Sequence, residues 1–166
     1  MTGLSMNNKE TTFRILDIIR GTTVDGPGFR TAIYLAGCRH ECQGCHNPQS
    51  WDENNGKEYT LEEILEIVKE EDFNVTLTGG DPLYNPEKTA LLAKEIKALG
   101  YEIWLYTGYL FEDILKSETL SLPLEYIDNI VDGPFVEDLR DTDLQFRGSS
   151  NQRIINLREI REKNMD

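Results

Sequence analysis

The sequence predicts an α/β fold, specifically a partial, incomplete and open α/β barrel with a mostly parallel sheet. Apolar segments rich in β-branched residues alternate along the chain with segments of helical periodicity. That order produces parallel strands joined by right-handed crossovers. The chain has 166 residues, whereas a complete eight-fold barrel takes about 250. A barrel of about five strands fits both observations.

We expect a single domain over residues 13–166 and a flexible N-terminal tail over residues 1–12. The first residues lack a basic segment followed by an apolar one, so no secretory signal is expected. No apolar run approaches the roughly 18 residues of a membrane helix. The formal net charge of −13 argues against nucleic-acid and membrane partners, because their surfaces attract basic faces. A cytoplasmic protein is therefore expected.

The N-terminal part predicts two strands. The segment beginning at Phe13 is typical of a short strand, and Asp25-Gly26-Pro27-Gly28 forms a turn signal after it. Residues 29–37, FRTAIYLAG, alternate in polarity and are rich in β-formers, which indicates a strand. A loop that contains every cysteine of the chain follows directly.

The middle part predicts two helices around a strand. Thr60 and Glu63 are spaced as a capping box, in which each side chain bonds the other residue's backbone N–H. The apolar face of this helix follows at i, i+3, i+4 and i+7, with Leu61, Ile64, Leu65 and Val68. Residues 73–80, FNVTLTGG, form a strand that runs into glycines.

The second helix has a start and a stop signal. Asn85-Pro86 is a typical N-cap and first-turn pair, and Gly100 is a typical residue just after a helix end. The buried stripe of this helix is expected at Leu92, Ile96 and Leu99.

The C-terminal part continues the alternation. Strands are expected in residues 101–108, 126–135 and 152–157, with a short helix in 110–117 and a charged helix at the end. Glycine-bearing segments follow four strands: the cysteine loop, TGGDP, YTGY and DGPF. Because ligands of parallel sheets sit at the carboxyl ends of the strands, we expect a cleft there.

The cysteines form one tight cluster. Cys38, Cys42 and Cys45 are spaced C-x3-C-x2-C within AGCRHECQGCHNP. Three thiols cannot all pair as disulfides, and a chain without a secretory signal is expected in a reducing compartment. The cluster therefore indicates a metal site rather than a disulfide framework.

Three interpretations of this cluster remain open on spacing. The cysteines could join His40 or His46 around a structural zinc ion, although ligands from one loop would connect little of the chain. They could be buried or redox thiols, although their neighbours are polar. They could hold a [4Fe–4S] cluster, in which three thiolates leave one iron open to another ligand.

A second motif adds a resemblance. CRHECQGC followed by TLTGGDPL resembles the radical S-adenosylmethionine superfamily. The resemblance implies that the amino and carboxylate groups of S-adenosylmethionine bind the open iron and that the glycine-rich segment binds the methionine amine. It implies these metal-binding and catalytic residues: Cys38, Cys42 and Cys45. It implies these cofactor-binding residues: Gly44, Cys45, His46, Gly79, Gly80 and Asp81.

The resemblance narrows further. Over residues 13–157, the chain resembles the activating proteins of anaerobic ribonucleoside-triphosphate reductase. The segments that together carry this resemblance are DGPGFR, AGCRHECQGCHNPQSW, TGGDPL, YTGY, DGPF and FRGSSNQRII. Two positions differ from much of the superfamily. Gly44 stands where many members have an aromatic residue, and Asp81 stands where many have Glu.

The family resemblance implies a reaction. Reduced flavodoxin or a similar donor gives the cluster one electron, and S-adenosylmethionine breaks into methionine and a 5′-deoxyadenosyl radical. That radical takes a hydrogen atom from the Cα of one glycine in the large subunit of the reductase. The loop that carries this glycine is expected to dock across the open edge of the barrel. Two alternatives are a radical S-adenosylmethionine enzyme acting on a small molecule, such as a deazapurine-forming synthase, and a non-enzymatic zinc-binding interaction module.

Overall fold

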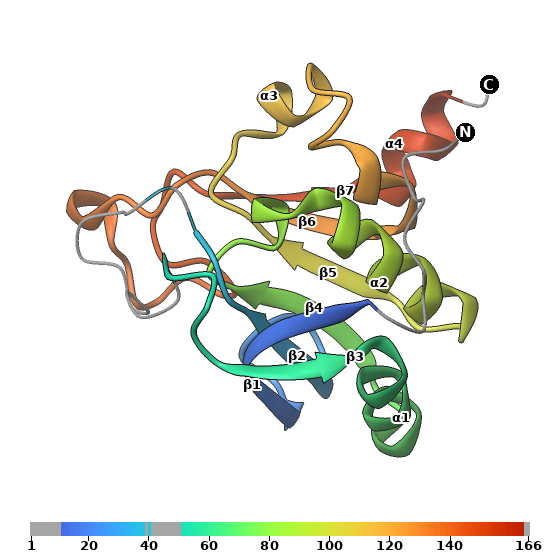
Figure 1. The fold of residues 1–166 in the computed structure, drawn as a ribbon. Helices are drawn as coiled ribbons and strands as arrows, with labels where there is room; N and C mark the ends of the chain where they lie inside the picture. The colour runs from blue at the N-terminus through green and yellow to red at the C-terminus, as the bar shows by residue number, and fades with distance from the viewer. Residues whose placement is uncertain (1–10, 39, 41–50, 165–166) are drawn as a thin grey trace.

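The computed structural model describes residues 11–38, 40 and 51–164 (Figure 1). Within these residues one sheet of seven strands has the order β3-β1-β2-β4-β5-β6-β7. The strands are β1 (Thr12–Thr22), β2 (Arg30–Leu35), β3 (Lys57–Thr60), β4 (Asn74–Gly79), β5 (Ile103–Tyr106), β6 (Asn129–Asp132) and β7 (Arg153–Asn156).

The four central strands are parallel, and the strands flanking them are antiparallel. β2, β4, β5 and β6 pair in parallel, whereas β1 pairs antiparallel with β2 and β3, and β7 pairs antiparallel with β6. The two edge strands, β3 and β7, do not pair with each other in the described part of the chain, so the sheet is open. The predicted open α/β architecture is confirmed. The short strand β3, which buries none of its residues, was not predicted.

Helices follow the strands in the predicted order. They are α1 (Leu61–Glu71), α2 (Pro86–Ala98), α3 (Phe111–Leu115) and α4 (Leu157–Asn164), with 3-10 turns η2 (Pro82–Tyr84), η3 (Leu122–Tyr126) and η4 (Glu137–Leu139). The predicted capping box is present: Glu63 N donates to Thr60 Oγ1 at 3.1 Å, and Thr60 N donates to Glu63 Oε1 at 2.9 Å. The prediction for Leu99 was wrong. It is 40% exposed because it caps α2, where the chain already turns away at Gly100.

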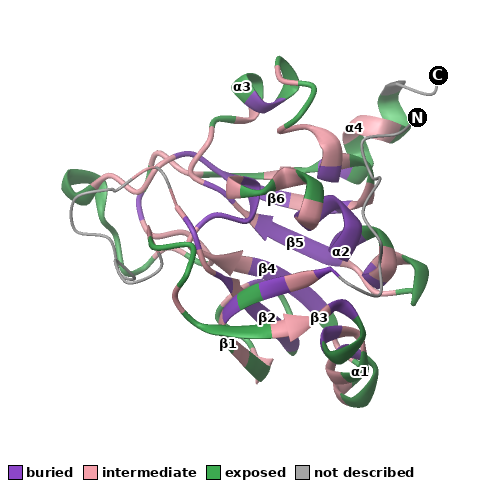
Figure 2. Cartoon of the chain, viewed as in Figure 1, coloured by how far each residue is buried: buried purple, intermediate pink, exposed green. Residues whose placement is uncertain are grey.

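One face of the sheet packs on the helices, and we call it the helix face. In Figure 1, α2 lies over β4 and β5 on this face. The apolar residues of the central strands and of α1 and α2 form one buried cluster, coloured purple on the strands in Figure 2. It includes Ile33, Leu35, Val75, Leu77, Ile103 and Leu105 from the strands, and Ile64, Val68, Leu92 and Ile96 from the helices. This cluster is the core of the domain.

The opposite face of the same strands is polar and aromatic, and we call it the loop face. Successive side chains of a strand alternate between faces, so this face carries Arg30, Tyr34, Thr76, Thr78, Trp104 and Tyr106. Irregular chain covers it. Thr76 Oγ1 donates to the Asp25 carbonyl at 2.6 Å, and the Phe146 ring packs edge-on against Trp104 at 5.6 Å between centroids. No described helix is long and apolar enough to cross a membrane.

Candidate active site

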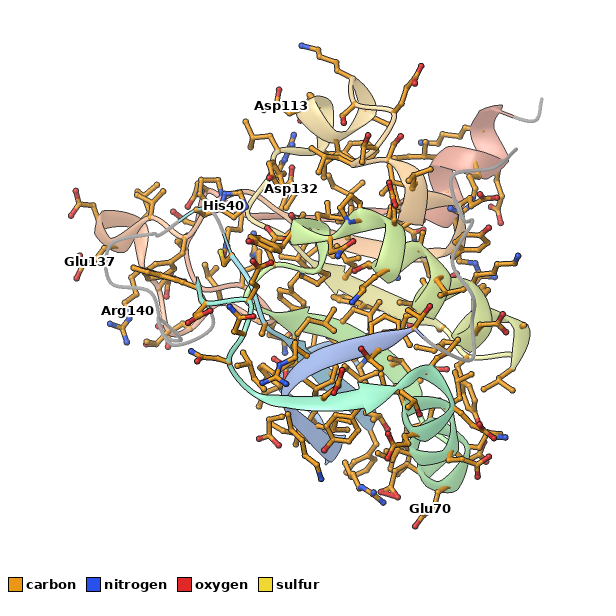
Figure 3. The ribbon with its side chains drawn as sticks, in the orientation of Figure 1. His40, Glu70, Asp113, Asp132, Glu137 and Arg140 are labelled. Carbon is orange, nitrogen blue, oxygen red and sulfur yellow. The ribbon has the colours of Figure 1, made fainter. Side chains whose placement is uncertain are left out.

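A cavity of about 320 Å³ opens at the carboxyl ends of the parallel strands. This volume lies in the range of about 300–1,000 Å³ that is usual for small-molecule sites. Figure 3 shows His40 beyond these strand ends. The described residues lining the cavity are Asp25, Tyr34, Cys38, His40, Thr78, Gly79, Gly80, Tyr106, Thr107, Gly108, Gly133, Phe135, Gly148 and Gln152. The cleft predicted from the glycine-bearing strand ends is therefore present.

Cys38 lies on the cavity wall, just after β2. Its backbone N–H donates to the Trp51 carbonyl at 3.3 Å, which joins the two ends of the cysteine loop. Gly37 precedes it with a φ of +104°, and a Cβ there would lie 2.7 Å from the Tyr84 ring. Cys42, Gly44, Cys45 and His46 lie outside the described residues.

Gly79 and Gly80 approach the same cavity from the end of β4. Gly79 has a φ of +115°, and a Cβ on it would lie 2.3 Å from the Leu35 backbone nitrogen. Gly80 N donates to the Leu35 carbonyl at 2.8 Å. A residue without a Cβ is therefore required at position 79, because the backbones of β2 and β4 pack closely there whether or not a ligand is bound.

Asp81 is buried, and its carboxylate joins three segments of the chain. Oδ2 accepts hydrogen bonds from Thr107 Oγ1 and from Gly108 N, both at 2.9 Å, and lies 2.7 Å from His40 Nε2. Oδ1 accepts from Leu83 N at 2.9 Å. Because an ionised carboxylate only accepts, Nε2 of His40 is the protonated nitrogen in this contact.

His40 is held on several sides. Its side chain is 17% exposed, and its ring meets Tyr109 edge-on at 4.6 Å between centroids. A Cβ on Gly108 would lie 2.6 Å from His40 Cδ2, so only glycine leaves room for the ring. Sequence patterns alone do not distinguish a loop histidine from a site residue at position 40. The structure shows His40 bonded to Asp81, after β4, with its ring against Gly108 and Tyr109, after β5.

A second level of the cavity lies one residue deeper along the strands. Tyr34 is in register with Thr78 across β2 and β4, and Tyr106 ends β5 beside them. Tyr34 Oη donates to Asp25 Oδ2 at 2.6 Å. Burial, and then the Asp25 carboxylate, raise the pKa of the Tyr34 phenol above its ordinary value. Both tyrosines and Asp25 line the cavity.

Arg30 fixes the loop that carries Asp25. The guanidinium is almost fully buried and donates to Thr76 Oγ1 at 2.9 Å, to the Pro27 carbonyl at 3.1 Å and to the Val75 carbonyl at 2.9 Å. It also pairs with Glu102 at 3.1 Å. The DGPGFR segment was predicted as a turn and a strand start, and its role in holding the loop face was missed.

The chain after β6 closes another side of the cavity. Gln152 Oε1 accepts from Gly148 N at 2.8 Å and from Ser149 N at 3.1 Å, while its Nε2 donates to the Gly133 carbonyl at 3.1 Å. The carboxamide thereby joins both ends of the segment 133–152. This explains why FRGSSNQ, which forms no strand, lies in a defined place beside the strand ends.

The structure brings together three of the predicted site residues: Cys38, Gly79 and Gly80. Asp81 is adjacent, but its carboxylate faces protein donors and does not line the cavity among the described residues. Tyr106 begins the YTGY segment that was expected at the cleft, and it lines the cavity. Sequence reasoning missed Tyr34 as a cavity residue, and its position one residue before the end of β2 was the available signal.

Comparisons with known proteins show the family of the chain. A family model described as a 4Fe-4S single cluster domain matches residues 24–155. The chain is 42% identical over 139 residues to the anaerobic ribonucleoside-triphosphate reductase-activating protein of Enterobacteria phage T4, covering 79% of this chain and 86% of that protein. It is 37% identical over 147 residues to the protein of the same name from Escherichia coli K12, covering 81% and 93%.

A solved structure supports the fold. The chain matches QueE from Escherichia coli with a TM-score of 0.51 at 16% sequence identity, over 61% of this chain and 55% of that one. Identity this low supports the architecture alone. The family match decides among the three interpretations of the cysteines in favour of the iron–sulfur cluster.

Proposed function

Since the chain belongs to the family of anaerobic ribonucleoside-triphosphate reductase-activating proteins, we propose that it generates a glycyl radical on the large subunit of such a reductase. The observation that carries this proposal is the identity of 37–42% over about four-fifths of the chain to proteins of that name. The relatives favour this activity over the small-molecule enzyme and the zinc-binding module.

The described residues fit the cofactors that this activity needs. Cys38, Gly79 and Gly80 all line the cavity. Cys38, with Cys42 and Cys45 from the same loop, would hold a [4Fe–4S] cluster at three irons. When bound, the cluster and S-adenosylmethionine supply the electron and the 5′-deoxyadenosyl radical for hydrogen abstraction.

The residues of the chain bind, orient and exclude water. We assign the backbone carbonyls of Gly79 and Gly80 to the ammonium of S-adenosylmethionine, as acceptors without a side chain in the way. Gly44, Cys45 and His46 remain cofactor contacts by prediction. Asp81 acts through His40: its buried carboxylate holds the cysteine loop against β5.

The electron donor and the location belong to the proposal. We propose reduced flavodoxin or a similar protein as the donor and the cytoplasm as the location. No side chain has to act as a general base, because the transferred particle is a hydrogen atom. This agrees with a site in which His40, the one described histidine, is already bonded to Asp81.

The experiment is anaerobic activation in a defined mixture. The iron-loaded protein, S-adenosylmethionine, a reductant and the large subunit of the reductase are combined, and the radical is followed by electron paramagnetic resonance. We expect a doublet signal on the reductase and one methionine released per radical or more. A reductase without the signal, in the presence of a loaded cluster, would refute the proposal.

The matched control is Cys42→Ala. One thiolate fewer leaves too few ligands for the cluster, so we expect loss of the brown absorbance, of bound iron and of all activation. The fold should persist, because the core lies on the helix face of the sheet. Retained iron in this variant would show that the ligand assignment is wrong.

A further inference from the structure

One apolar aromatic ring lines the active-site cavity on the side of β6. Phe135 follows this strand, is partly exposed, and shares the cavity with Gly79 and Gly80 of the β4 end. The other described rings of the lining all carry polar atoms: Tyr34, Tyr106 and His40. Phe135 therefore offers the cavity an aromatic surface with no hydrogen-bonding group of its own.

The backbone around Phe135 holds its ring in place. A Cβ on Gly148 would lie 3.1 Å from Phe135 Cδ1 and 3.3 Å from Cε1, so the ring rests closely against the Gly148 backbone. Gln152 fixes this arrangement, because its Oε1 accepts from Gly148 N at 2.8 Å and its Nε2 donates to the Gly133 carbonyl at 3.1 Å. A ring that is already held costs a ligand little ordering entropy on binding.

The order of the strands separates Phe135 from the glycines of β4. Only β5 lies between β4 and β6, and all three strands are parallel. Neighbouring strands lie about 4.8 Å apart, so the ends of β4 and β6 are roughly 10 Å apart. Cys38 follows β2, on the opposite side of β4 from β6. A ligand that binds Gly79 and Gly80 by one end reaches Phe135 only if it extends across the end of β5.

The two ends of S-adenosylmethionine differ in their chemistry. The methionine end carries an ammonium and a carboxylate, and the proposed function places it at the open iron and at the carbonyls of Gly79 and Gly80. The other end is adenine, a flat aromatic base that binds well against the face of an aromatic side chain. With the methionine end between the cysteine loop and β4, the adenine extends toward β6.

We propose that Phe135 is the aromatic contact of the adenine of S-adenosylmethionine. Gly133 and Gly148 line the cavity beside the ring, and neither has a side chain to fill the space of a base. This inference rests on the proposed function, which supplies the cofactor, and deepens it by assigning the second end of the ligand to a residue after β6.

The test is a titration of S-adenosylmethionine into the iron-loaded, reduced protein without the reductase. Binding is followed by the change in the electron paramagnetic resonance spectrum of the cluster. In Phe135→Ala we expect the Kd to rise about tenfold, which corresponds to about 1.4 kcal/mol, because the stacking contact is lost. The spectrum at saturation should equal that of the unaltered chain, since the methionine end still binds the iron.

A second variant separates the aromatic face from apolar bulk. Phe135→Leu fills much of the same space but has no flat ring, so we expect a Kd between those of Phe135→Ala and the unaltered chain. Phe29→Ala is the matched control. Phe29 is 64% exposed, stacks on Phe73 at 5.8 Å between centroids, and is not among the described residues that line the cavity. Its removal should leave the Kd unchanged.

Three results would overturn the inference. An unchanged Kd in an iron-loaded Phe135 variant would show that the ring does not contact the base. A different spectrum at saturation would place the ring at the methionine end, and loss of iron from both Phe135 variants would make the ring a support of the cysteine loop. Failure of the proposed function is distinct, because the unaltered chain would then bind S-adenosylmethionine but form no radical on the reductase.

Discussion

The same strands carry the hydrophobic core on one face of the central sheet and the lining of the cavity on the other. On the helix face, Ile33, Leu77 and Leu105 are fully buried and belong to the apolar core cluster. On the loop face, Tyr34 and Tyr106 line a cavity, and irregular segments cover the rest. Alternation along each strand, with a period of two residues, is what separates them.

The difference shows where stability and chemistry reside. Burial of apolar surface contributes about 25 cal/mol per Å², and the core cluster lies on the helix face. The loop face instead holds buried polar groups by specific hydrogen bonds, such as those of Arg30 to Thr76 and to the Pro27 carbonyl. We therefore expect substitutions on the two faces to affect different measurements.

The largest effect on stability is expected on the helix face. Leu77→Ala removes a fully buried side chain from the centre of β4, and such changes cost about 2–5 kcal/mol of the free energy of unfolding. S-adenosylmethionine affinity, measured at a temperature where the variant is folded, should change little. A large loss of affinity at full folding would contradict the separation of the two faces.

The sequence predicted the helix face well. Local patterns specify it: the capping box at Thr60 and the spacing of Ile64 and Val68 both require only neighbours within one or two helical turns. The wrong residue, Leu99, lies one position beyond the end of α2, where periodicity no longer decides burial. The strand β3 escaped prediction because its four residues bury nothing.

The loop face could be predicted only in part. Strand-end glycines and cysteines indicated where the site lies. The contacts that build it join residues far apart in sequence: His40 and Asp81 are 41 residues apart, and Asp81 and Thr107 are 26 apart. Nothing in a local pattern says that a carboxylate after β4 will face a hydroxyl after β5. For the same reason, Gly79 was predicted as a ligand contact, whereas the structure shows that its lack of a Cβ is already required by the β2 backbone.

An intermediate effect is expected at Asp81, beyond the end of β4, where its carboxylate joins His40 to Thr107 and Gly108. In Asp81→Asn the side chain keeps its shape, but one oxygen becomes an NH₂ group. It can no longer accept from His40, Thr107 and Gly108 together. Hydrogen bonds to charged groups contribute about 1.5–3 kcal/mol each, and the hydroxyl can reorient, so we expect a net loss of about 2–3 kcal/mol in unfolding free energy.

The same variant should also loosen the cysteine loop. Iron retention during anaerobic gel filtration should fall, because His40 loses its anchor. Thr107→Val is a matched control, since it removes one donor and leaves the carboxylate in place; it should retain iron better than Asp81→Asn. Equal iron retention by Asp81→Asn and the unaltered chain would show that the loop does not depend on this anchor.

The smallest effect is expected at the exposed Glu112, whose partner Arg153 also pairs with the buried Asp132. Glu112 is exposed, and its bidentate contact with Arg153, at 2.6 and 2.8 Å, lowers the pKa of the carboxyl from 4.5 to about 2. A pKa lowered in the folded state stabilises the fold above the unfolded value, and that contribution is lost as the pH falls from 4.5 toward about 2. Solvent screening makes it small. Urea unfolding at pH 7 should therefore barely separate Glu112→Gln from the unaltered chain. The small difference that exists should shrink as the pH falls from 4.5 toward about 2, because the Glu112 carboxyl is progressively protonated and then resembles the neutral Gln. A difference that grows with acid would show that the stabilising charge is not that of Glu112.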